Sequence, residues 1–267
     1  MMKVVMYFFI LCLALLLPYG CGSGRNREEK LASTTEGLIK QLSSSPSWYT
    51  RSRAADALGE KGPAAAKAVP ALTAALEDEQ QDVRSTAAWA LGEIGSAAVS
   101  AKPALIRSLA KYDKYEFPNV GEALIKIGLT GSETDTVVSI LREALVQARR
   151  FYKKAYAAKL LGDIGPAASD AVPDLVRALH MTGDTDRDVC ESAIDALGNI
   201  GQKSTVPQIA KFLYDKDHSV SFSATVAIAK LTGKRPNTQN LKDWWESEGC
   251  HMEWNDQEAA SPNEATE

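Results

Sequence analysis

The chain has few of the residues that carry catalytic or metal chemistry. Its three histidines are all separated by more than four residues, which excludes an HExxH-type metal site. Its four cysteines form no C-x-x-C pair, which excludes a zinc knuckle and a thioredoxin-type redox motif. No G-x-S-x-G, P-loop or dinucleotide-binding motif occurs. We therefore expect no catalytic residues, no metal and no cofactor, and a protein that is not an enzyme.

An excess of positive charge is also missing. Thirty Lys and Arg stand against 34 Asp and Glu, giving a net charge of −4 and a pI of about 5.6. A protein of this charge has no general attraction for nucleic acid, so none is expected as a partner. Strand-like alternation of polar and apolar residues is absent after the first twenty residues, and the remaining pattern is helical.

The longest apolar run covers residues 4–17 and has 14 residues, whereas a membrane-spanning helix needs roughly 20. With Lys3 directly before it, this run is typical of the core of a signal peptide, which we assign to residues 1–20. Residues 21–33 are small and charged, and we expect them to form a flexible tether.

Cys21 directly follows a glycine at the end of this segment. The junction resembles the bacterial lipobox, although Pro18 stands where that motif has leucine. The resemblance implies a lipid on Cys21 and, with Gly22 next to it, a place at the outer membrane. The alternative is an ordinary secretory signal that is cleaved near Gly20 or Gly24, with Cys21 incidental.

Glycines recur along the rest of the chain with intervals of 33, 33, 37, 36 and 32 residues, at Gly62, Gly95, Gly128, Gly165, Gly201 and Gly233. A repeat of this period indicates one supersecondary unit that is stacked many times. Prolines follow four of these glycines by six to eight residues, at Pro70, Pro103, Pro173 and Pro207. A glycine that ends one helix and a proline that opens the next define a helical hairpin.

Helical periodicity between these marks predicts a solenoid over residues 34–248, opened by a helix at 34–43. Six hairpins are predicted, at 46–61/66–77, 82–94/101–111, 117–127/133–148, 150–164/169–181, 186–200/203–214 and 217–231/238–247. Trp244 and Trp245 are predicted to cap its last open face. Residues 249–267 have five acids and no Lys or Arg, and we expect a disordered acidic tail.

Two stretches resemble a known repeat: DVRSTAAWALGEIG (82–95) followed by AKPALIRSL (101–109), and DRDVCESAIDALGNIG (186–201). They are similar to HEAT repeats of the short, phycobilisome-lyase-like bacterial type. The resemblance implies an all-α, right-handed solenoid of about six HEAT hairpins whose second helices line the concave face. The motif is specific for architecture and almost silent on activity, and the leading hypothesis for the function is a non-catalytic scaffold that binds another protein. The alternatives are a chromophore or bilin lyase-like protein and an assembly factor for an envelope complex.

The pattern breaks in the third repeat, where we expect the partner to bind. Between 111 and 118 the usual D-x-x-V-R motif gives way to exposed aromatics and charge, and a basic run follows at 149–154. For residues 111–118 the alternative is an irregular repeat whose aromatic side chains fill a gap in the packing. For the basic run the alternative is an ordinary solvent-exposed helix face. The candidate partner-binding residues are Tyr112, Lys114, Tyr115, Phe117, Arg149, Arg150 and Lys153.

These expectations combine into one hypothesis. The protein is a scaffold held by a lipid in the cell envelope, on the periplasmic side of the outer membrane, or else it is secreted. Its partners are an unidentified protein and, through the lipid, the membrane.

Overall fold

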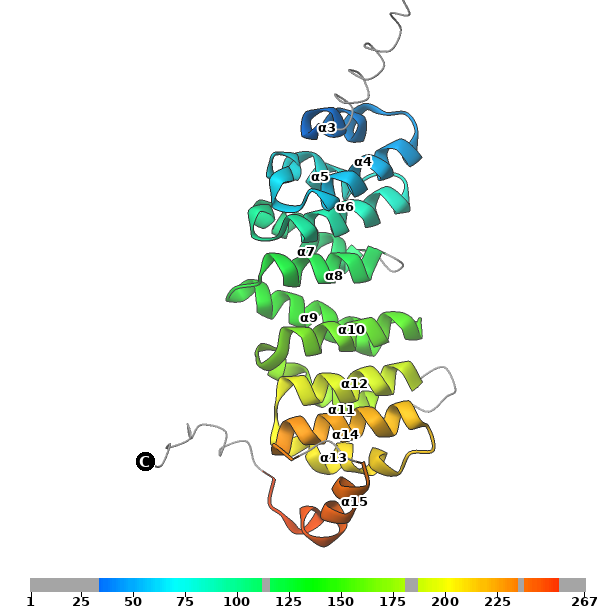
Figure 1. Cartoon of the computed structure of the whole chain (residues 1–267), viewed down its shortest axis with the longest axis vertical. Coiled ribbons are helices and arrows are strands. Elements are labelled where there is room, and N and C mark those ends of the chain that lie inside the picture. Colours follow the sequence, from blue (N-terminus) through cyan, green and yellow to red (C-terminus); the bar gives the residue numbers. More distant parts are fainter. Residues whose placement is uncertain (1–33, 112–115, 181–186, 235–237, 255–267) are drawn as a thin grey trace, which may run out of the picture.

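A computed structural model describes residues 34–111, 116–180, 187–234 and 238–254. Over these residues nearly all of the chain is helical and no strand occurs. The helices stack side by side along one long axis, as Figure 1 shows. The all-α solenoid predicted from the glycine spacing is therefore confirmed. None of the helices in this part of the chain is long and apolar enough to cross a membrane.

The six predicted hairpins are present. Their first helices are α4 (Trp48–Glu60), α6 (Gln81–Ile94), α8 (Glu116–Ile127), α10 (Phe151–Ile164), α12 (Arg187–Ile200) and α14 (His218–Thr232). Their second helices are α5 (Val69–Ala75), α7 (Lys102–Lys111), α9 (Ser132–Gln147), α11 (Val172–Ala178), α13 (Val206–Ala210) and α15 (Thr238–Ser247), and α3 (Thr35–Ser44) precedes them. Short 3₁₀ helices complete the turns: η1 (Gly62–Ala68), η2 (Gly95–Ala101), η3 (Gly165–Ala171), η4 (Lys203–Thr205), η5 (Lys211–Tyr214) and η6 (Gly249–His251).

The glycine and proline marks act as predicted. Gly95 ends α6 with φ +67° and ψ −140°, a backbone conformation that residues with a side chain rarely adopt. Proline stands in the first turn of α5, α11 and α13, where the missing N–H has no helical partner. The chain therefore turns sharply at each glycine and starts the next helix at each proline.

The first helices of neighbouring hairpins approach each other very closely. A Cβ atom on Gly92 of α6 would lie 3.0 Å from the Cα of Ala123, and one on Gly162 of α10 would lie 2.8 Å from the Cα of Ala196. First helices accordingly make the most extensive contacts between elements, while second helices touch each other little. The layer of first helices is thus the tighter of the two.

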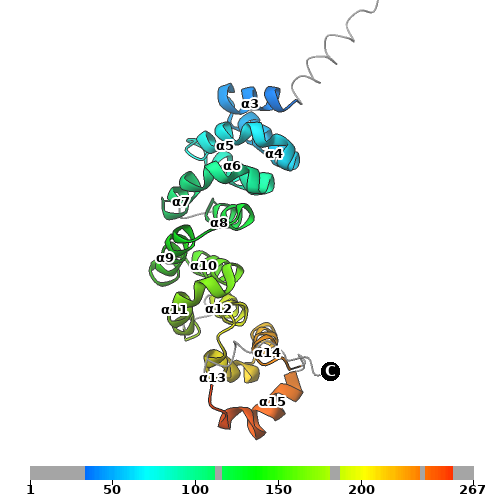
Figure 2. The ribbon, with the colours of Figure 1, turned by 90° about the vertical axis from the view of Figure 1, so that its left-hand side faces the viewer.

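This difference in spacing bends the solenoid. Figure 2 shows the first helices on the inner side of the curve and the second helices on the outer side. The prediction that the second helices line the concave face is therefore wrong. The physical reason is that the glycines of the first helices bring their backbones together, so this layer is the shorter one.

The junction of the third and fourth hairpins departs from this rule. Ile125 occupies the place that Gly92 and Gly162 hold in their helices, and α8 contacts α10 far less than α6 contacts α8. The outer layer is tied at this junction by an ion pair of 2.7 Å between Arg142 Nε of α9 and Asp174 Oδ2 of α11. The solenoid is therefore least tightly packed between α8 and α10.

Three tryptophans close the C-terminal end. Trp244 is 9% exposed, and its ring centre lies 6.2 Å from that of Trp245 and 6.0 Å from that of Trp254. Trp254 Nε1 donates to the carbonyl of Gly249 at 3.0 Å. The expectation of disorder is therefore wrong for 249–254, because this third indole packs on the other two. Residues 255–267 lie outside the described residues, as do the signal segment and tether at 1–33.

Candidate partner-binding site

In the first two hairpins, an arginine at one position of the first helix bonds to the loop before that helix. Eleven residues before the repeat glycine, Arg51 donates from Nη1 to the carbonyl of Ser45 at 3.0 Å and forms two bonds of 2.7 and 2.8 Å with the Asp78 carboxylate. The guanidinium lowers the pKa of Asp78. At the same position in the next repeat, Arg84 donates to the carbonyls of Asp78 and Glu79 at 2.8 and 3.0 Å. The arginine thus satisfies carbonyls of the preceding loop.

The third repeat has Phe117 at this position. Its ring is 1% exposed and has no donor with which to reach a carbonyl. Lys153 of α10 lies over the ring, with its Nζ 4.8 Å from the ring centre, a distance that permits a cation–π interaction. An apolar ring and a lysine from the following repeat thus replace the arginine.

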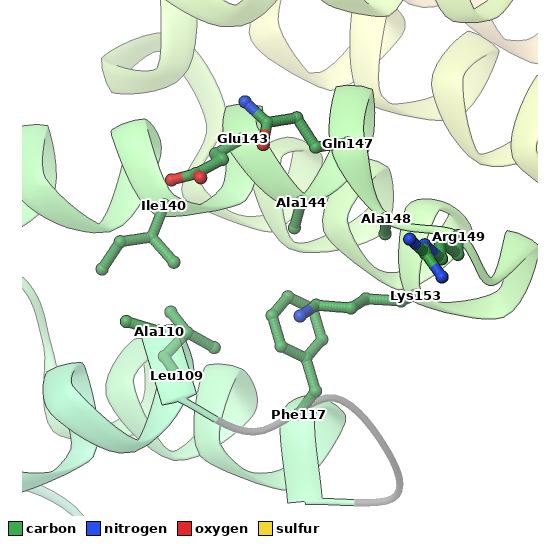
Figure 3. Close-up of a pocket in the computed structure, with 10 residues that line it drawn as sticks. All are labelled: Leu109, Ala110, Phe117, Ile140, Glu143, Ala144, Gln147, Ala148, Arg149 and Lys153. Carbon is green, nitrogen blue, oxygen red and sulfur yellow. The ribbon is translucent and has the colours of Figure 1, made fainter.

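A cavity of about 330 Å³ opens beside this ring. Figure 3 shows α9 on one side of it and α7 with the start of α8 on the other. Apolar side chains form its walls, namely Leu109, Ala110, Phe117, Ile140, Ala144 and Ala148. Polar and charged side chains also line it, namely Glu143, Gln147, Arg149 and Lys153. In Figure 3 the two cations extend from one end of the cavity, and Glu143 lies away from Arg149.

The structure brings part of the predicted partner-binding set together. Phe117, Arg149 and Lys153 line one cavity although they come from two separate stretches of sequence. Arg150 precedes α10 as its N-cap and is exposed, but it does not line the cavity. Tyr112, Lys114, Tyr115 and Cys21 lie outside the described residues.

Phe117 corrects one expectation. It was predicted as an exposed anchor, but it is buried because it occupies the inward-facing arginine position of the repeat. The sequence also left out Ile140, Glu143 and Gln147, which reach the cavity because α9 runs for 16 residues. Two features of the sequence could have pointed to these three residues: the long interval between Gly128 and Gly165, and the absence of a proline after Gly128.

Chemical groups suited to catalysis do not gather at this site. Among the described residues, no three His, Cys, Asp or Glu side chains lie close enough to hold a metal ion. The cavity itself contains a single carboxylate and no histidine or cysteine. Its arrangement is suited to binding an apolar group beside a negative charge.

Stacked helical hairpins with a cavity of this kind define a helical-repeat protein. The sequence matches the HEAT repeats over residues 35–125 and 138–229, more than half of the chain. The chain therefore belongs to the HEAT repeat family. No curated protein matches it.

Solved structures support the same fold. A crystal structure of an engineered protein is 25% identical, with a TM-score of 0.56 over 74% of this chain and 96% of that one. Importin beta is 18% identical, with a TM-score of 0.58 over 79% of this chain and 33% of its own length. A designed armadillo repeat protein in complex with a (KR)4 peptide is 17% identical, with a TM-score of 0.53 over 73% and 98% of the two chains.

A phycocyanin lyase complex from Nostoc sp. is 27% identical over 78% of this chain and 68% of that one. Its TM-score is 0.40, which is too low to carry an argument about this chain.

Proposed function

We propose that this protein is a non-catalytic scaffold that binds a protein partner at the third repeat. The observation that carries the proposal is the cavity beside Phe117, where an apolar wall and two cations meet in the irregular third repeat. A recess of about 400 Å³ also lies beside Arg51, but that cation is paired with Asp78, whereas the third repeat has the apolar ring of Phe117 in its place. Recesses with apolar walls and charged rims are typical of the centres of protein interfaces.

Membership of the HEAT repeat family supports this proposal, since such repeats present long surfaces. The similar designed armadillo repeat protein was solved in complex with a peptide. A fold does not by itself define a function, so the proposal depends mainly on the cavity and on the charged residues that line it.

We further propose that a lipid on Cys21 anchors the scaffold in the cell envelope, on the periplasmic side of the outer membrane. The support is the sequence around Cys21, where a short apolar core ends in glycine and cysteine. Labelled palmitate fed to cells should enter the wild-type chain and not Cys21→Ala. Equal labelling of both chains would rule out this anchor.

Photo-crosslinking in intact cells tests the scaffold directly. A photoreactive residue placed at Gln147, on the rim of the cavity, should capture a partner protein that is detected by mass spectrometry. The matched control carries the same residue at Gln81, at the start of α6 and away from the cavity. If Gln147 captures nothing beyond what Gln81 captures, the cavity is not the partner site.

A further inference from the structure

We infer that the cavity binds an acidic peptide segment of the partner, with one large aliphatic side chain inside it and carboxylates against Arg149 and Lys153. This inference rests on the proposed scaffold function and adds the chemistry of the partner. Four observations carry it: the size of the cavity, its apolar walls, the position of its cations and the charge around it.

The cavity has room for a buried side chain. Its volume of about 330 Å³ is at the lower end of the range of roughly 300–1,000 Å³ that is typical of ligand pockets. Leu109 of α7 and Ile140 of α9 face each other across it in Figure 3. An aliphatic side chain between them would leave water for an apolar environment.

The charged residues at the cavity determine which residues of the peptide can lie next to that aliphatic side chain. Arg149 is exposed, and neither it nor Arg150 forms an ion pair with another residue of the described part of the chain. Lys153 extends from the same end and holds its ammonium group above the ring of Phe117. A carboxylate beside Arg149 and Lys153 would gain charge-assisted hydrogen bonds, whereas a basic group at the same place would be repelled by both cations.

Glu143 determines the direction in which the bound peptide runs. It lies in the cavity away from Arg149, so a peptide carboxylate on that side is disfavoured. The acidic residues of the partner therefore follow the aliphatic side chain toward the start of α10. The basic run at 149–154 is a local exception in a chain of net charge −4, so attraction for acidic groups is concentrated here.

A peptide explains these features better than a membrane does. A lipid surface would require exposed apolar groups that protrude, whereas Leu109 and Phe117 are each 1% exposed and lie in a recess. A single extended segment can place one side chain in such a recess.

A random peptide library displayed on phage and selected on the full chain in detergent tests the inference. Selected peptides should share a Leu, Ile or Met next to two or more acidic residues. Their binding should weaken at least tenfold in the double variant Arg149→Gln, Lys153→Gln, and it should weaken with added salt. The matched control is Arg53→Gln, Lys61→Gln, which removes two exposed cations far from the cavity.

A second variant tests the recess without changing charge. Ala110 is exposed and lines the cavity, so Ala110→Leu fills it and should also abolish peptide binding. The control, Ala97→Leu, adds the same side chain at an exposed position of η2 and should bind as wild type does. Circular dichroism confirms that each variant is folded.

Several results would overturn the inference. These are selection of basic or uncharged peptides, no selected peptides, or peptides that bind Ala110→Leu unchanged. Binding of the chain to phosphatidylglycerol vesicles that depends on Arg149 and Lys153, without peptide binding, would favour a membrane instead. Peptide binding seen only after removal of residues 255–267 would make the acidic tail the occupant. Capture at Gln147 that survives the double variant would leave the scaffold standing and refute only the acidic peptide.

Discussion

At the scale of single residues, the arginine position explains both the regular repeats and the exception. Arg51 and Arg84 hold loop carbonyls, and at the same position Cys190 donates to the carbonyl of Leu179 at 3.8 Å. Phe117 has no such bond and packs in the core instead. The third repeat thus has a buried apolar ring at the position where the first two repeats have an arginine bonded to loop carbonyls.

Phe117→Ala should destabilise the protein by about 3–5 kcal/mol, because it removes a ring that is 1% exposed and leaves a void. Urea unfolding followed by circular dichroism measures the change. Phe222→Ala is the control: its ring is 65% exposed, and its loss should change the unfolding free energy by no more than about 0.5 kcal/mol. Equal effects of the two variants would contradict the burial of Phe117.

The two cysteines of the solenoid should differ sharply in reactivity. Burial, with Asp215 and Glu191 nearby, raises the pKa of Cys190 to about 11, whereas Cys250 is exposed. The thiolate is the reactive form, so Cys190 stays protonated until the pH approaches 11. Iodoacetamide at pH 8 should label Cys250 in the native protein and Cys190 only after unfolding, as peptide mass spectrometry would show. Native labelling of Cys190 at a similar rate would contradict this.

At the scale of the helices, the spacing of first helices depends on residues that lack a side chain. Gly162 meets the backbone of Ala196, which moves only if the whole of α12 moves. The three atoms nearest to a Cβ on Gly121 of α8 all belong to the side chain of Leu160, which has other rotamers. These two glycines, in neighbouring first helices, therefore differ in whether the structure around them can accept an added side chain.

Gly162→Ala should destabilise the protein by about 1–3 kcal/mol through this backbone clash. Gly121→Ala should be close to neutral, since alanine favours the helix by about 1 kcal/mol and Leu160 can rotate away. Thermal unfolding of both variants measures the difference. A loss of stability in Gly121→Ala as large as that in Gly162→Ala would show that Leu160 is as rigid as a backbone.

At the scale of the whole molecule, stability is a sum of repeat and neighbour terms. The neighbour term is smallest between α8 and α10, where Ile125 replaces glycine and the inner helices touch little. Partner binding at this junction would join the two halves of the solenoid across their weakest contact.

Hydrogen exchange should show that the helices at this junction open more easily than the regular repeats do. Amides of α8 and α9 should exchange faster than those of α6 and α12, because fewer contacts oppose their local opening. Mass spectrometry of deuterated peptides, compared helix by helix, measures the rates. Uniform protection along the chain would mean that the junction is as stable as the regular repeats.

The periodic glycines and prolines were enough to predict the helices, their hairpins and their order, because helix ends depend on local backbone chemistry. They also located the irregular repeat. The direction of the bend was not predictable from them, since it depends on how closely two layers of helices pack. The meeting of Phe117 with Arg149 and Lys153 was not predictable from the sequence either. These residues come from stretches more than thirty residues apart and are brought together only by the stacking of α8, α9 and α10.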